Sequence, residues 1–126
     1  MRVLLVEDDA VLASLVMEAL AQDGHQAVHV RGPDEALALA NRCVWDAFVV
    51  DAFGAHMEPD AEYRATLKQL AARGRVVVTS GRAWATNAAA SDLGADAVLT
   101  KPYDLSELSD MLSSFPAQPD RSAATS

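Results

Sequence analysis

The sequence predicts an α/β fold, in which a doubly wound, five-stranded parallel sheet carries helices on both faces. Short apolar runs alternate along the chain with segments in which apolar residues recur every three or four positions. Alternation of strand and helix is typical of parallel sheets. With 126 residues, 51% of them hydrophobic, the chain has the size and apolar content of one domain.

The strands are expected near residues 2–6, 26–30, 47–50, 76–79 and 97–100. Amphipathic helices connect them. The apolar stripes that mark three of these helices are formed by Leu12, Leu15, Val16 and Ala19, then by Tyr63, Leu67, Leu70 and Ala71, and last by Leu105, Leu108, Leu112 and Phe115. A further helix, rich in alanine, is expected over residues 84–93.

Helix ends carry their own signals. Pro33 suits the first turn of the helix that follows the second strand, and Asp104 with Glu107 forms a capping-box pattern before the last helix. Glycines stand where three helices are expected to end, at Gly24, Gly74 and Gly94.

The order of the strands follows from their composition. A central parallel strand is buried on both faces and is continuously apolar, as the first, third and fourth strands are. The second strand alternates, and the fifth is short and carries Asp96, so both are expected at the edges. The predicted order is 2-1-3-4-5, which places a ligand site at the carboxyl ends of the first and third strands.

Charge and composition exclude several functions. The net charge of −8 argues against a partner with a phosphate backbone, so we expect protein partners and no nucleic acid. Cys43 is the single cysteine, which excludes an internal disulfide, and it is expected to be a small buried or half-buried apolar side chain. No apolar run approaches the about 20 residues of a membrane span. We expect a cytoplasmic protein with a folded domain at residues 1–115, followed at residues 116–126 by a polar tail or the start of a linker.

Reactive residues stand where the strands end. Glu7 and Asp8 follow the first strand, Asp51 the third, Thr79 the fourth and Lys101 the fifth. In a parallel sheet these groups meet at one edge. Carboxylates that converge repel each other unless a cation or proton joins them, so the pattern predicts a divalent metal. The hydroxyl and the ammonium group suit a phosphoryl group.

Neighbouring polar residues have simpler interpretations. Asp9 is expected to cap the following helix or to face solvent rather than to bind metal. His25 and His29 are expected to be structural residues, and His56 an exposed loop residue.

With these motifs placed, the chain resembles the receiver domain of two-component response regulators, the CheY-like members of the flavodoxin-like folds. The resemblance covers residues 1 to about 115. The matching motifs are Val6-Glu7-Asp8-Asp9, Asp51, Thr79-Ser80-Gly81 and Lys101-Pro102. The resemblance implies that a phosphohistidine donates a phosphoryl group to Asp51.

The resemblance also implies how the remaining residues act. Asp8 and Asp51 would bind Mg²⁺ directly, Glu7 would act through water, and Phe53 would add its backbone carbonyl. Thr79 and Lys101 would each bind an oxygen of the phosphoryl group.

Two departures from the family pattern bear on signalling. The loop at residues 52–60 lacks the usual Pro-Gly sequence, and Val98 stands where the family carries an aromatic switch residue. A ring flip is therefore excluded as the output change. The hypothesis is that backbone shifts after Thr79 and in residues 84–93 carry the signal.

We therefore expect a stand-alone phosphoacceptor that receives its phosphoryl group from a sensor histidine kinase or a histidine phosphotransfer protein and switches a contact with an unknown target. It would be a monomer or weak dimer, and no enzyme beyond catalysing its own phosphorylation and dephosphorylation. The alternative is a receiver-like interaction module that does not depend on phosphate. A metal-dependent phosphatase is less favoured, because no further nucleophile or base is apparent.

Overall fold

The computed structural model of the chain describes residues 1–51, 61–80, 94–100 and 104–115. The strands in these ranges are β1 (Arg2–Val6), β2 (Gln26–Val30), β3 (Ala47–Asp51), β4 (Arg75–Ser80) and β5 (Ala97–Thr100). The helices are α1 (Ala10–Gln22), α2 (Pro33–Arg42), α3 (Ala61–Ala71) and α6 (Leu105–Ser114). The helix expected at residues 84–93 lies outside the described residues.

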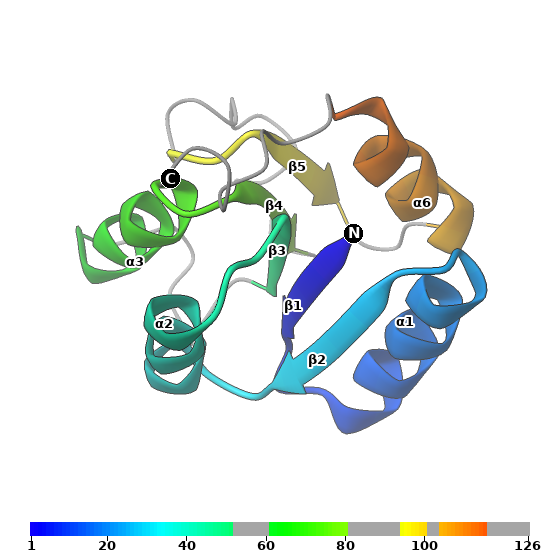
Figure 1. The fold of residues 1–126 in the computed structure, drawn as a ribbon, viewed down its shortest axis with the longest axis horizontal. Coiled ribbons are helices and arrows are strands. Elements are labelled where there is room, and N and C mark those ends of the chain that lie inside the picture. The colour runs from blue at the N-terminus through cyan, green and yellow to red at the C-terminus, as the bar shows by residue number, and fades with distance from the viewer. Residues whose placement is uncertain (52–60, 81–93, 101–103, 116–126) are drawn as a thin grey trace, which may run out of the picture.

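The strands form one parallel sheet in the order β2-β1-β3-β4-β5, as the sequence predicts (Figure 1). All five expected strands are present, and β3 and β4 extend slightly beyond their expected bounds. Asp51 is consequently the last residue of β3 and pairs with Thr79 of β4. The sheet itself, rather than a loop, therefore sets the position of both residues.

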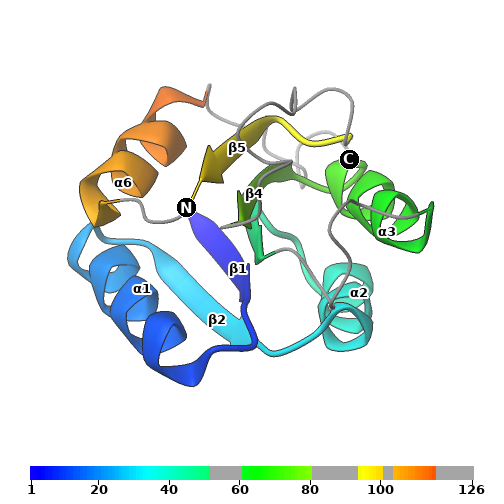
Figure 2. The same cartoon turned by 180° about the vertical axis from the view of Figure 1, so that it is seen from behind.

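Helices cover both faces of the sheet. Figure 2 shows α1 and α6 together on one face, with α2 and α3 on the other. The side chains of each central strand alternate between two apolar clusters. In β1, Leu4 and Val6 pack toward α2 and α3, whereas Val3 and Leu5 pack toward α1 and α6. This alternation explains why the central strands are apolar at every position.

Local signals at the helix ends are largely confirmed. Asp9 is the N-cap of α1, because its Oδ1 accepts hydrogen bonds from the backbone N–H groups of Val11 (3.0 Å) and Leu12 (3.2 Å). Pro33 opens α2, and the Asp104 N–H donates to Glu107 Oε1 at 3.3 Å.

Part of the predicted helix packing is wrong. Leu15 was expected in the buried stripe of α1 but is 50% exposed. Val16 is buried as expected, together with Ala13 and Leu20, which the stripe did not include. The sequence of α1 is apolar on nearly all sides, so its periodicity does not identify one face. In α3, Ala71 is likewise exposed.

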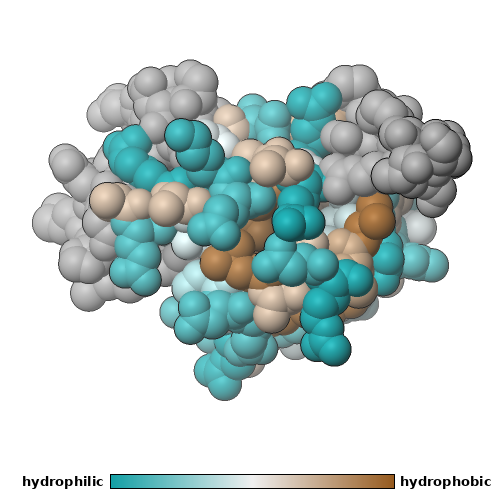
Figure 3. Space-filling model, turned by 60° about the vertical axis from the view of Figure 1, so that its left-hand side comes forward, coloured by the Kyte–Doolittle hydropathy of each residue, from teal (hydrophilic) through white to brown (hydrophobic). Residues whose placement is uncertain are grey.

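The surface of the described residues is mostly hydrophilic. Figure 3 brings the α2 and α3 side forward and shows apolar residues in brown between hydrophilic residues in teal. In the described part of the chain the exposed large apolar side chains are Val11, Leu15, Val28 and Val44. None of the helices in that part is long and apolar enough to span a membrane.

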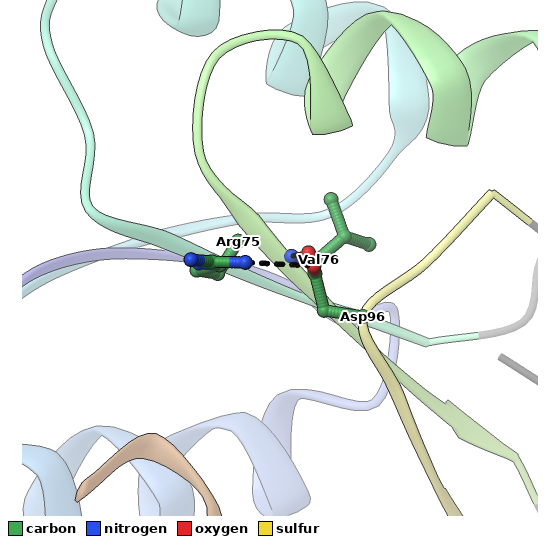
Figure 4. A network of polar contacts seen from close by, with 3 residues as sticks. All are labelled: Arg75, Val76 and Asp96. Carbon is green, nitrogen blue, oxygen red and sulfur yellow. Dashed lines mark hydrogen bonds and ion pairs between the residues drawn. The ribbon is translucent and has the colours of Figure 1, made fainter. Parts of the chain in front are cut away.

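An acid holds the start of β4 to the start of β5. Asp96 lies just before β5, whose bounds agree with the expected 97–100, and its Oδ2 accepts from the Val76 N–H at 2.8 Å. Its Oδ1 lies 3.2 Å from Arg75 Nη1 (Figure 4). The Arg75 guanidinium also lies over the Phe115 ring, 5.9 Å from its centre. The end of α6 is thereby anchored at the amino edge of the sheet.

We predict that a side chain at Gly74 destabilises the fold. A Cβ atom there would lie 3.1 Å from both Phe48 Cε2 and the Trp45 carbonyl oxygen. Gly74→Ser should therefore lower the free energy of unfolding by about 1–3 kcal/mol in urea denaturation. The control is Gly32→Ser, where nothing lies within 4 Å and serine is a good N-cap. Equal stability of the two variants would contradict this packing.

A second prediction concerns the pH dependence of stability. Burial, and next the charge of the N-terminal amine, lower the pKa of His25 below 6.5. As the pH falls below that value, the unfolded chain binds a proton that the folded chain resists, so the free energy of unfolding falls. We expect His25→Leu to flatten this decline as the pH falls from neutral through 6.5, measured by urea denaturation. An unchanged slope would exclude His25 as its source.

Candidate functional site

Three carboxylates meet at the carboxyl edge of the sheet, where β1 and β3 lie side by side (Figure 1). Val6 pairs with Val50, so the residues that follow, Glu7 with Asp8 and Asp51, reach the same place. One oxygen from each carboxylate lies within 4.8 Å of the others. The structure thus brings together the three acids that the sequence placed at one edge.

The three acids differ in their exposure to solvent. Glu7 is 3% exposed, Asp51 is half-buried and Asp8 is exposed. A buried carboxylate such as Glu7 is costly unless hydrogen bonds or a cation compensate it. Glu7 Oε2 accepts a hydrogen bond from the Asp9 N–H at 3.3 Å. This bond supports the carboxylate from the same turn that carries Asp8.

Backbone hydrogen bonds hold the turn from β1 to α1. The Glu7 N–H donates to the Val30 carbonyl at 3.1 Å, and the Glu7 carbonyl lies 2.8 Å from His29 Nε2. On its other side the turn ends in the Asp9 cap of α1. The turn is therefore fixed both to the edge strand and to the helix.

Thr79 lies beside the acceptor candidate. It pairs with Asp51 across β3 and β4, and paired residues of neighbouring parallel strands point to the same face about 4.8 Å apart. Thr79 is 2% exposed. The register alone therefore brings a hydroxyl next to the Asp51 carboxylate.

The structure adds Tyr63, which the sequence analysis counted only as a core residue of α3. It lies in the first turn of α3 and is 5% exposed. Burial, and next the negative charge of Asp51, raise the pKa of Tyr63 well above its ordinary value, so the phenol stays neutral. The signal that could have identified it is a tyrosine in an apolar stripe, in the first turn of a helix that begins at the ligand edge.

The remaining expected residues are only partly described. Val98 lies in β5, pairs with Val78, and packs partly buried against the core on the α2 and α3 side. Phe53 and Lys101, like His56 and the loop at 52–60, lie outside the described residues.

The donor atoms of this cluster suit one kind of ion. All three are carboxylate oxygens, and no histidine or cysteine belongs to the group within the described residues. Oxygen donors favour hard divalent cations such as Mg²⁺ over metals that prefer nitrogen or sulfur. The cluster therefore fits magnesium.

Comparison with known sequences identifies relatives. A family model for the response regulator receiver domain matches residues 3–113. The transcriptional regulatory protein TcrA of two Mycobacterium tuberculosis strains is 32% identical over 108 residues, which is 85% of this chain and 42% of TcrA. The chain thus spans about two fifths of the length of these relatives.

Solved structures share the fold. The receiver domain of the sensor histidine kinase PA1611 from Pseudomonas aeruginosa is 21% identical with a TM-score of 0.71, covers 88% of this chain and 93% of its own, and carries magnesium in its active site cleft. A CheY-like receiver domain protein from Methanospirillum hungatei is 22% identical with a TM-score of 0.74, covering 89% and 90%. Vibrio cholerae CheY4 is 19% identical with a TM-score of 0.72, covering 89% and 95%.

The geometry predicts opposite behaviour for two adjacent acids. Asp8→Asn removes one of three clustered charges, so it should raise the free energy of unfolding without magnesium and abolish the rise in melting temperature on adding Mg²⁺. Asp9→Asn keeps an oxygen for the α1 cap and lies outside the cluster, so it should retain the magnesium response. Thermal unfolding with and without MgCl₂ measures both. An equal magnesium response of the two variants would contradict the assignment.

Proposed function

Because the chain belongs to the response regulator receiver domain family, we propose that it accepts a phosphoryl group from a phosphohistidine onto Asp51 in a Mg²⁺-dependent reaction and thereby switches a protein contact. The observation that carries this proposal is the gathering of Glu7, Asp8 and Asp51 within 4.8 Å, with Thr79 paired to Asp51.

Asp51 is the acceptor because of its place among the three acids. Glu7 is 3% exposed, which leaves a donor little access to it. Asp8 is accessible but belongs to the turn after β1, which β3 separates from β4. Asp51 is half-buried, lies between the β1 acids and the Thr79 hydroxyl, and ends a strand that is buried on both sides.

The transfer balances as a simple displacement. A carboxylate oxygen of Asp51 forms a bond to phosphorus, and the bond from phosphorus to the imidazole nitrogen of the donor breaks. The electron pair of that broken bond stays on the nitrogen, which takes up a proton. The product is an acyl phosphate on Asp51.

The three acids would hold the cation that offsets the negative charge of the phosphoryl group. When bound, Mg²⁺ would neutralise the negative charge where carboxylate and phosphoryl oxygens approach each other. Asp8 and Asp51 would be direct ligands, Glu7 would hold a ligand water, and the Phe53 carbonyl would complete the protein's donors. This role for Glu7 agrees with its burial, which favours a fixed acceptor of hydrogen bonds.

Two further groups would bind the phosphoryl oxygens. The Thr79 hydroxyl would donate to one of them, which its register with Asp51 supports. Lys101 would pair with another as a compact charge. With Val98 at the switch position, the response to this binding would move the backbone after Thr79 rather than turn a ring.

The proposed partners are proteins. A sensor histidine kinase or a histidine phosphotransfer protein would supply the phosphoryl group, in the cytoplasm, and a target protein would read the result. We expect a monomer or a weak dimer. Since TcrA is named a transcriptional regulatory protein, the absence of nucleic-acid contact is proposed for residues 1–115 alone, where the net charge of the chain, −8, opposes it.

In this proposal the domain does not act on a separate substrate. The domain would act on itself, by assisting transfer to Asp51 and later hydrolysis of the acyl phosphate. The alternative, an interaction module independent of phosphate, leaves unexplained why three carboxylates are held together despite their repulsion.

The test is phosphorylation by a small acyl phosphate or phosphoramidate with Mg²⁺, followed by intact-protein mass spectrometry. We expect one added phosphoryl group, lost in Asp51→Asn and retained in Asp34→Asn, which changes an exposed acid in the first turn of α2. Thermal unfolding of both variants confirms that they fold. An unmodified wild-type chain, or a fully modified Asp51→Asn variant, would overturn the proposal.

A further inference from the structure

His29 lies on the edge strand β2 but contacts the turn that carries two of the clustered acids. Its Nε2 lies 2.8 Å from the carbonyl oxygen of Glu7. A carbonyl oxygen only accepts hydrogen bonds, so Nε2 carries the hydrogen and donates it. The bond is short and joins two elements that are 22 positions apart in the sequence.

This side chain takes the place of a backbone partner. In the parallel ladder the Glu7 N–H donates to the Val30 carbonyl at 3.1 Å, and the next backbone N–H available to the Glu7 carbonyl would belong to Gly32. The chain has left the strand by then, because β2 ends at Val30 and Gly32 is already the N-cap of α2. The imidazole of His29 supplies the donor that the ladder would have provided.

The register of the sheet determines on which face the His29 imidazole lies. His29 pairs with Leu5, which packs on the α1 and α6 face, so the ring lies on the same face as α1. The residue is half-buried there. From this position it extends along the strand direction to the residue two places beyond Leu5, where the acids begin.

We propose that His29 is a positioning residue for the metal site, which holds the backbone of Glu7 so that the Glu7 and Asp8 carboxylates stay beside Asp51. The inference rests on the proposed function, since it assigns His29 to the binding of Mg²⁺. The carboxylates lie within 4.8 Å of each other and repel, so the turn that carries two of them needs support from outside the cluster. His29 gives that support on the β2 side, and the Asp9 cap gives it on the α1 side.

Removal of this donor should weaken metal binding without removing a ligand. Partners that orient metal ligands typically contribute about 10- to 100-fold in metal affinity. We expect the lower end, about tenfold, because His29 acts through the backbone and not on a carboxylate. The rate of phosphorylation at saturating Mg²⁺ should remain close to that of the wild type, since every ligand is still present.

The experiment compares His29→Leu, which fills the space without an N–H, with His29→Gln, whose amide nitrogen donates from a similar place. The matched control is His25→Leu, because His25 precedes the same strand but its Nδ1 contacts the N-terminal amine, 3.0 Å away at the opposite edge of the sheet. Calorimetry gives the Mg²⁺ dissociation constant, and urea denaturation without metal gives the stability of each variant.

For His29→Leu we expect a dissociation constant about tenfold higher, with a matching shift in the Mg²⁺ concentration for half-maximal phosphorylation. His29→Gln should recover most of the affinity, and His25→Leu should keep it. In the metal-free protein, amide hydrogen exchange at Glu7 and Asp9 should become faster in His29→Leu alone.

The outcomes separate the two proposals. If the wild type binds Mg²⁺ and is phosphorylated, but His29→Leu binds the metal as tightly, the role of His29 is wrong and the proposed function stands. If His29→Gln is as impaired as His29→Leu, the N–H donor is not responsible, and the inference also fails. A wild-type chain that neither binds Mg²⁺ nor accepts phosphate would overturn the proposed function itself.

Discussion

Repulsion between the carboxylates at the end of β1 and β3 is the constraint on which the rest of the structure depends. Three negative groups with oxygens within 4.8 Å of one another oppose folding, and the domain has to offset that cost elsewhere. It does so with a sheet whose central strands are buried on both faces, as the wholly buried run from Val3 to Val6 shows. The apolar core and the charged edge are therefore parts of one arrangement.

Because the sheet holds the three acids close together, their repulsion would favour the binding of a cation. Because the backbone fixes the acids, a small divalent cation that prefers oxygen ligands would bind more tightly here than to the same acids on an unfolded chain. The register of β3 with β4 adds a hydroxyl beside Asp51 at no further cost in backbone entropy, since Thr79 is already a strand residue. The function proposed for this domain thus depends on which residues end the strands.

The strands, their order and the acidic cluster are predictable from the sequence, because each depends on a pattern that is local along the chain. Asp51 directly follows an unbroken apolar run, and any parallel sheet brings the end of that run to the ligand edge.

The packing of α1 is less predictable. Leu15 is apolar and correctly spaced, yet it faces solvent, since a helix with apolar residues on most sides has no single preferred face. The hydrogen bond of His29 to Glu7 leaves no sequence signal, because its acceptor is a backbone carbonyl just beyond the end of the β1–β2 ladder, where the chain after β2 already turns into α2. The proximity of Tyr63 to Asp51 likewise depends on how α3 is rotated about its axis.

The contact of Arg75 with Phe115 fixes the place at which the chain leaves α6. It ties the exit of the last helix to the beginning of β4, whereas the acids lie beyond the other tip of the strands. A five-residue strand is about 16 Å long, so a polypeptide continuing past Phe115 starts roughly that far from any chemistry at Asp51. A structural change at Asp51 would therefore have to be transmitted along the whole length of the strands to reach the chain that follows α6.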